Sequence, residues 1–114
     1  TTMDEFLACQ ERRRRRETAM KCMADDVQWL LNQPAGSVTW DRSQNDLIDL
    51  IDCVWAMRVI TGKGGKLMTR KAIAEKVFAT VGRTCPKRLT QAVWDVRNRR
   101  LPEHSMMRKY MVEK

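Results

Sequence analysis

Apolar residues recur through most of the chain at alternating steps of three and four, which is the spacing of a helix buried along one face. In the first third, this stripe comprises Met20, Met23, Val27 and Leu30. Toward the amino terminus the stripe passes through Arg13 and Arg16, so only the second half of the helix is expected to pack fully on a core. Thr2 followed by Glu5 has the spacing of a capping box and predicts that the helix begins there and ends near residue 31.

The pattern changes after this first helix. Residues 32–36 contain a proline and a glycine and predict a loop, and the alternation of polar and apolar residues over 37–40 predicts a short strand. Residues 44–60 are the most apolar stretch of the chain, and either Asp41 or Ser43 is placed to cap them. We therefore expect this second helix to form the centre of the core.

Three further helices are predicted in the second half of the chain. Thr69 is a suitable cap for a helix over residues 70–80, and Gly82 is a suitable stop, because glycine adopts the left-handed conformation at low cost. After a turn of four residues, a proline at the first position fits the start of a helix over residues 86–99. A last helix, also opened by a proline, is predicted over residues 102–112.

Together these elements predict a mainly α protein, a helical bundle with a long amino-terminal helix and a helix-turn-helix-like unit. A small sheet near Trp40 and Leu67 would make this unit a winged helix. We expect an arginine-rich helix and linker over residues 1–36, followed by a helical DNA-binding-like domain over residues 37–114. The tryptophans at positions 29, 40, 55 and 94 are interpreted as packing residues.

The net charge of +8 is concentrated in one segment of the chain. Residues 61–100 carry eleven basic and two acidic side chains, whereas residues 1–38 carry six of each. A polyanion is the expected partner of such a segment, because each phosphate that a cation neutralises releases condensed counterions. A basic solvated face has the same composition, so the helices that carry the charge decide the interpretation.

The predicted helices over residues 70–80 and 86–99 have the pattern of a unit that reads the major groove of DNA. The candidates for contacts with base edges are Lys87, Arg88 and Gln91. The candidates for contacts with phosphates are Arg70, Lys71, Arg83, Thr84, Arg97, Arg99 and Arg100. Arginine and lysine suit guanine and glutamine suits adenine, so we expect double-stranded DNA as the partner. Lys63 and Lys66, in a glycine-rich loop, are placed for further phosphate contacts.

Metals, cofactors and catalysis are not expected. Asp46, Asp49 and Asp52 recur at steps of three and are interpreted as a solvated stripe or as partners of the basic half. The four cysteines are scattered and His104 is the only histidine, so neither a zinc site nor a catalytic group is predicted. No stretch approaches the roughly 20 apolar residues that span a membrane, and a cytoplasmic bacterial protein is expected.

A second function class follows from the amino-terminal helix. Its five consecutive arginines, residues 12–16, lie among acidic residues, so residues 1–38 have no net charge. The alternative to a DNA-binding protein is therefore a non-enzymatic interaction module. In that case the amino-terminal helix binds a partner protein or forms a homodimer, and the basic segment serves solubility or binds an acidic protein.

One family has a similar arrangement of apolar and basic positions. The relevant segments are Trp40, Leu47 to Ile51, Ala72 to Ala74 with Phe78, and Val96 to Arg99 ahead of a final helix. Over residues 39–112 this arrangement resembles the carboxy-terminal helical domain of RteC-type regulators of bacterial conjugative transposons. The resemblance implies an all-helical or winged-helix-like domain that acts on regulatory DNA of a mobile element. An accessory role in excision, mobilisation or transcription is equally compatible with it.

Overall fold

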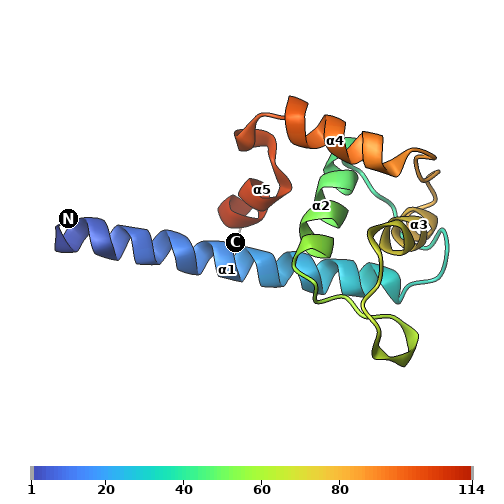
Figure 1. Cartoon of the computed structure of the whole chain (residues 1–114), viewed down its shortest axis with the longest axis horizontal. Helices are drawn as coiled ribbons and strands as arrows, with labels where there is room; N and C mark the ends of the chain where they lie inside the picture. Colours follow the sequence, from blue (N-terminus) through green and yellow to red (C-terminus); the bar gives the residue numbers. More distant parts are fainter. Residues whose placement is uncertain (1, 114) are drawn as a thin grey trace.

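The structure is a computed structural model that describes residues 2–113 (Figure 1). Its α-helices are α1 (Met3–Leu31), α2 (Gln44–Ala56), α3 (Arg70–Thr80), α4 (Leu89–Arg99) and α5 (Met106–Glu113), and its short 3-10 turns are η1 (Lys63–Gly65) and η2 (Pro102–His104). The prediction of a mainly α bundle with a long amino-terminal helix is confirmed. Over residues 2–113 there is no β-strand, and a single antiparallel bridge joins Thr61 to Leu67.

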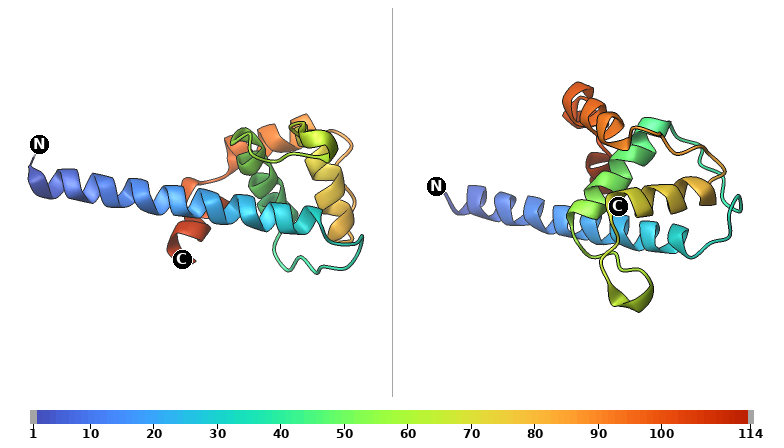
Figure 2. Two further views of the ribbon diagram at one scale, coloured as in Figure 1. Left: turned by 90° about the horizontal axis from the view of Figure 1, so that it is seen from below. Right: turned by 45° about the vertical axis from the view of Figure 1, so that its right-hand side comes forward.

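Helix α1 begins where the capping pattern predicts. The hydroxyl oxygen of Thr2 accepts a hydrogen bond from the backbone N–H of Glu5 at 3.2 Å, which satisfies one of the free donors of the first turn. Only the second half of α1, from Ala19 onward, has buried residues. Residues 2–18 extend away from the rest of the molecule, and we call them the arm (Figures 1 and 2).

Helix α2 lies at the centre of the core, as predicted, and it packs against each of the other four α-helices. Its Leu47 and Val54 are completely buried. The largest buried side chain is Phe78 of α3, which joins Met23 of α1 in the same cluster. Burial of each such side chain stabilises the fold by about 1.5–3 kcal/mol. The apolar stripes of the sequence therefore converge on one core.

Capping residues fix the ends of α2 and α3. Ser43 accepts a hydrogen bond from the N–H of Asp46, and Thr69 accepts one from the N–H of Ala72, each at 3.1 Å. Gly82 has a φ of +69° and ends α3, because the left-handed conformation lets the chain fold back onto the last carbonyls. These caps and the glycine stop were all predicted from the sequence.

The predicted strand over residues 37–40 does not form. This segment instead lies along the end of α3, where the N–H of Gly36 donates to the carbonyl of Ala79 at 2.9 Å and that of Val38 donates to Thr80 at 3.2 Å. The last carbonyls of a helix have no partner within the helix, so they take these donors. The local alternation of polar and apolar residues cannot show that the N–H groups of this segment bond to the end of α3 and not to a neighbouring strand.

Helix α2 ends at Ala56 and not at the predicted Ile60, because Arg58 adopts a positive φ of +58° and turns the chain. Ile60 is buried nonetheless, which is why the apolar pattern continues past the helix end. Residues 60–68 then form a hairpin-like loop in which Gly62 and Lys66 are joined by a backbone hydrogen bond of 2.9 Å. This loop, with η1 at its tip, projects from the body (Figure 2).

Two predicted helix starts lie too early. Pro86 precedes α4, which begins at Leu89, the first residue of the stripe that packs on the core. Pro102 opens only η2, and α5 begins at Met106. Helix α5 then lies against α1, where the hydroxyl of Tyr110 donates to Asp26 at 2.6 Å. Burial and this hydrogen bond raise the pKa of Tyr110 well above its ordinary value.

The tryptophans divide into two pairs. Trp40 and Trp55 pack against the core, as predicted. Trp29 and Trp94 are about half exposed, so their interpretation as packing residues is wrong. Each of these two stands one position from a buried residue, Leu30 and Val93, and therefore points away from the core around its helix.

Candidate nucleic-acid interface

The three aspartates of α2 are not a solvated stripe. Asp46 and Asp52 are only 5% and 6% exposed, and α3, α4 and α5 surround this side of α2. A buried carboxylate is costly unless cations and hydrogen-bond donors compensate for it. Several of the arginines proposed for phosphate contacts provide that compensation, which confirms the alternative interpretation of the aspartates as partners of the basic half.

Asp52 binds two arginines from different helices. Arg97 of α4 donates from Nε to Oδ2 and from Nη2 to Oδ1, both at 2.7 Å, which is the bidentate geometry of a strong pair. These hydrogen bonds raise the pKa of Arg97 above its ordinary value. Arg70, at the start of α3, approaches Asp52 Oδ1 at 3.3 Å and also lies over the ring of Trp55, 4.8 Å from its centre.

The other two aspartates connect α2 to the end of the chain. Asp46 accepts hydrogen bonds from Arg100 and from Lys109, the latter at 2.9 Å. Asp49 accepts one from the backbone N–H of Met106 at 2.7 Å and so caps the first turn of α5. The acidic stripe therefore holds α3, α4 and α5 on α2.

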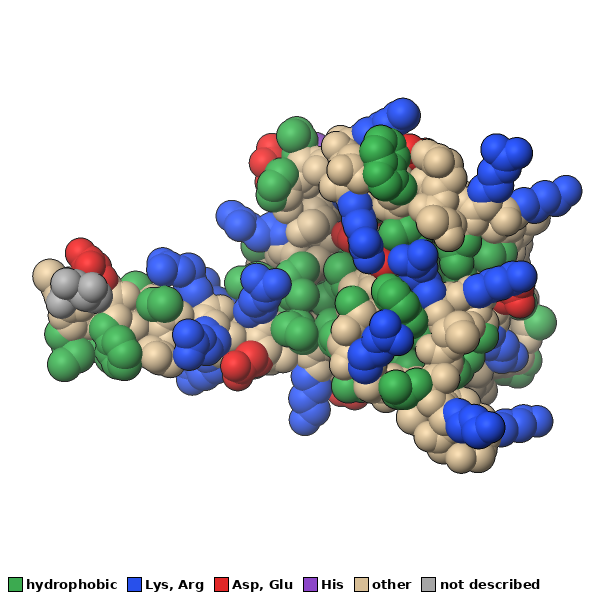
Figure 3. All heavy atoms as spheres, viewed as in Figure 1, with side chains coloured by type: hydrophobic (Ala, Val, Ile, Leu, Met, Phe, Trp, Pro, Cys, Tyr) green, Lys and Arg blue, Asp and Glu red, His purple; other side chains and the backbone are tan. Residues whose placement is uncertain are grey.

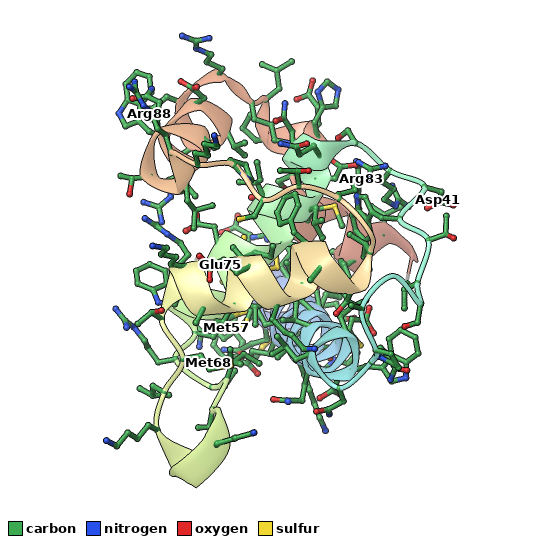
Figure 4. The ribbon with its side chains drawn as sticks, turned by 90° about the vertical axis from the view of Figure 1, so that its right-hand side faces the viewer. Asp41, Met57, Met68, Glu75, Arg83 and Arg88 are labelled. Carbon is green, nitrogen blue, oxygen red and sulfur yellow. The ribbon has the colours of Figure 1, made fainter. Side chains whose placement is uncertain are left out.

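Three further candidates, Arg83, Thr84 and Arg99, do not line this acidic stripe. Arg83 donates from Nη2 to the backbone carbonyl of Trp40 at 2.7 Å, and Figure 4 shows it near Asp41, on the other side of the molecule from Arg88. Arg99 is exposed at the far end of α4, 3.9 Å from Asp95. Thr84 is exposed in the linker between α3 and α4.

The remaining cations of the basic segment are exposed and form what we call the basic stripe. It comprises Lys63, Lys66, Lys71, Lys76, Lys87 and Arg88. Figure 3 shows lysine and arginine side chains along the right-hand side of the molecule, from the start of α4 across α3 to η1. Of these cations, Lys71 lies 4.0 Å from the carboxylate of Glu75.

A cleft lies beside this stripe, between α3 and the start of α4. Its volume is about 790 Å³. The polar side chains that line it include Arg70, Lys71, Glu75, Lys87, Arg88, Thr90 and Gln91. All three candidates for base contacts therefore stand at one cleft, together with two of the candidates for phosphate contacts. Gln91 donates to Asp95 at 3.1 Å, so its amide would have to exchange this partner to reach a base.

The apolar part of the cleft is formed by Trp55, Pro86, Leu89 and the thiol of Cys85. Burial raises the pKa of Cys85, so the thiol is protonated at neutral pH. A protonated thiol among apolar groups is a packing residue and not a nucleophile. The chemistry of the cleft is thus positive charge beside an apolar wall.

Sequence reasoning did not include Lys76 among the site residues, and it gave Lys63 and Lys66 only a minor part. The available signal was that all three carry charge at positions off the apolar stripes. Arg97 and Arg100 pair with aspartates of α2. The sequence signal for these pairs was weaker: the two arginines are three residues apart, as are successive aspartates of α2.

Comparison with known proteins adds no assignment. No family model, no curated protein and no solved structure matches the chain. None of the helices described is long and apolar enough to cross a membrane. In the same part of the chain, no three histidine, cysteine or acidic side chains gather in a way that would hold a metal ion.

Proposed function

We propose that this protein binds double-stranded DNA through the basic stripe and the cleft beside it, as a regulator or accessory factor of a mobile genetic element. The observation that carries the proposal is the difference between the cations of the basic segment that pair with the aspartates of α2 and those that form the basic stripe. Arg70, Arg97 and Arg100 compensate buried aspartates, whereas the six cations of the basic stripe are exposed. Lysine and arginine side chains gather along one side of the molecule, from the start of α4 across α3 to η1 (Figure 3). Exposed cations that the fold does not use are available to phosphates.

The geometry suits a duplex. The projecting loop with Lys63 and Lys66 stands at one end of the stripe, and the first turn of α4 stands at the other. In such an arrangement the lysines of η1 and α3 hold the phosphate backbone, which fixes position but not sequence. Lys87, Arg88 and Gln91 then approach base edges from the start of α4.

The arrangement of α3 and α4 differs from that of a tightly packed helix-turn-helix pair. The linker from residue 81 to 88 is longer than the predicted turn, and α3 and α4 each pack on α2. We therefore propose groove entry by the exposed start of α4 and not by a tightly packed helix pair. The resemblance to RteC-type domains implies the same class of ligand, and excision, mobilisation and transcription all require it.

The test is a salt titration of binding to random-sequence duplex, followed by fluorescence polarisation. Four to six neutralised phosphates give a slope of about −4 to −5 for the logarithm of affinity against that of salt. Lys87→Glu with Arg88→Glu should weaken binding at least tenfold at 0.1 M salt and reduce the slope by about 2.

The matched control is Arg13→Glu with Arg16→Glu, which makes the same change of charge on the exposed arm. This variant should bind DNA like the parent. A parent affinity that does not change with salt, or an equal loss in both variants, would refute the stripe as the DNA-binding surface.

A further inference from the structure

The arm buries little of its surface against the rest of the described structure. All its residues but Glu11 are exposed, and its tip presents three apolar side chains, Met3, Phe6 and Leu7, which are 70%, 52% and 56% exposed. An isolated helix of this length is marginal in water, because most helical stability in proteins comes from packing of one face. Exposed apolar side chains grouped at one end indicate that something covers them.

A groove of matching character lies at the base of the arm, between α1 and the end of α5. Its volume is about 820 Å³. Four arginines line it, namely Arg12, Arg14, Arg15 and Arg108, and Glu11 is the single carboxylate among its lining residues. Met111 and Val112 of α5 give it an apolar edge. The groove therefore suits an acidic segment that also carries apolar side chains.

The tip of the arm has this composition, with Asp4 and Glu5 beside Met3, Phe6 and Leu7. We propose that two copies of the chain associate through antiparallel arms, with the tip of each copy in the groove of the other. The proposal does not depend on the DNA-binding surface, which lies at the opposite end of the molecule (Figures 1 and 3).

The direction of pairing follows from the order of charges along α1. The acidic residues Asp4 and Glu5 precede the arginines of residues 12–16. A parallel pair would place arginines beside arginines, whereas an antiparallel pair places the acidic tip of one copy beside the arginines of the other. The pair is then isologous, because the same surface is used twice around a two-fold axis.

The helix geometry places Asp4 of the tip on the same face as part of the groove lining. Asp4, Glu11, Arg15 and Thr18 are separated by steps of seven, four and three, and the last three line the groove. Arg13 and Arg16 lie outside this set and are not part of the groove lining. Arg13 and Arg16 therefore serve as control positions on the same helix.

The test uses charge reversal and needs no nucleic acid. The tip-reversed variant is Asp4→Lys with Glu5→Lys, and the groove-reversed variant is Arg12→Glu with Arg15→Glu. Sedimentation equilibrium should show a dimer for the parent and a dimer dissociation constant at least tenfold higher for each variant alone. An equimolar mixture of the two variants should regain the parent's affinity, because lysine tips then meet glutamate grooves and acidic tips meet arginine grooves.

Matched variants separate this contact from others. Arg13→Glu with Arg16→Glu should dimerise like the parent, and so should the cleft variant Lys87→Glu with Arg88→Glu. A monomeric parent at every concentration, or a mixture that stays monomeric although circular dichroism shows both variants folded, overturns the proposal. A groove-reversed chain that loses only DNA affinity while the parent is monomeric also overturns it and assigns the groove to nucleic acid.

Discussion

Asp46 shows how one buried residue links charge to stability. Burial would raise the pKa of this carboxyl group, but hydrogen bonds from Arg100 and Lys109 outweigh burial and lower the pKa below its ordinary value of 3.8. The folded protein therefore favours the ionised form of Asp46 over the protonated form more than the unfolded chain does. This contribution to stability is complete above about pH 4 and is lost as the pH falls through the lower, folded value.

We expect Asp46→Asn to reduce the free energy of unfolding by about 2 kcal/mol at pH 7, because the variant removes the carboxylate that binds both Arg100 and Lys109. Below pH 4 its stability should fall less steeply than that of the parent. Urea unfolding at pH 7 and at steps below pH 4 measures both effects. Asp25→Asn, at an exposed position of α1, is the control and should have little effect. An unchanged pH profile in Asp46→Asn would show that the pair does not contribute.

At the scale of elements, local sequence signals placed most boundaries. Thr2, Ser43 and Thr69 cap the helices as expected, because a cap depends on residues three positions apart. The errors arose where distant groups decide, as at residues 37–40, which bind the end of α3. The pair between Arg97 and Asp52 spans 45 residues, so the sequence indicated that the aspartates could pair with the basic half but not which arginine each one binds. The three residues proposed for base contacts do lie at one cleft, whereas the sequence did not separate the arginines that pair with the aspartates of α2 from the other cations.

Gly82 is a position at which a local sequence signal, the glycine that ends α3, can be tested. Its φ of +69° is a conformation that a side chain makes costly, although a Cβ there would meet only Gly36 at 3.9 Å. We expect Gly82→Ala to lower the free energy of unfolding by about 1 kcal/mol, and Gly82→Asn by less, because asparagine tolerates this region. Thermal unfolding followed by circular dichroism gives the ranking. Equal losses in both variants would point to packing instead of backbone strain.

At the scale of the whole molecule, the protein consists of a body with a projecting arm. The cations of the body differ in whether they pair with the aspartates of α2. Arg70, Arg97 and Arg100 pair with the aspartates of α2, whereas the cations of the basic stripe are exposed and make no such pair within residues 2–113. Lysine and arginine side chains gather along one side of the body (Figure 3). The sequence shows only the total of paired and unpaired cations, which is why the count over residues 61–100 overstated the free positive charge. A dimer through the arms would join two such bodies, and its geometry would set the separation of two DNA half-sites.

A shortened chain that begins at Gln10 tests the contribution of the arm's tip separately from that of the body. It lacks the acidic and apolar tip but retains the arginines of the groove and every buried residue of α1. Because the tip contacts nothing in the body, the free energy of unfolding should change by no more than about 0.5 kcal/mol. Dimerisation should be lost, and the DNA affinity of the monomer, measured at nanomolar protein, should equal that of the parent. Unfolding of this shortened chain would mean that the tip supports the body, whereas a retained dimer would place the contact between copies elsewhere on the surface.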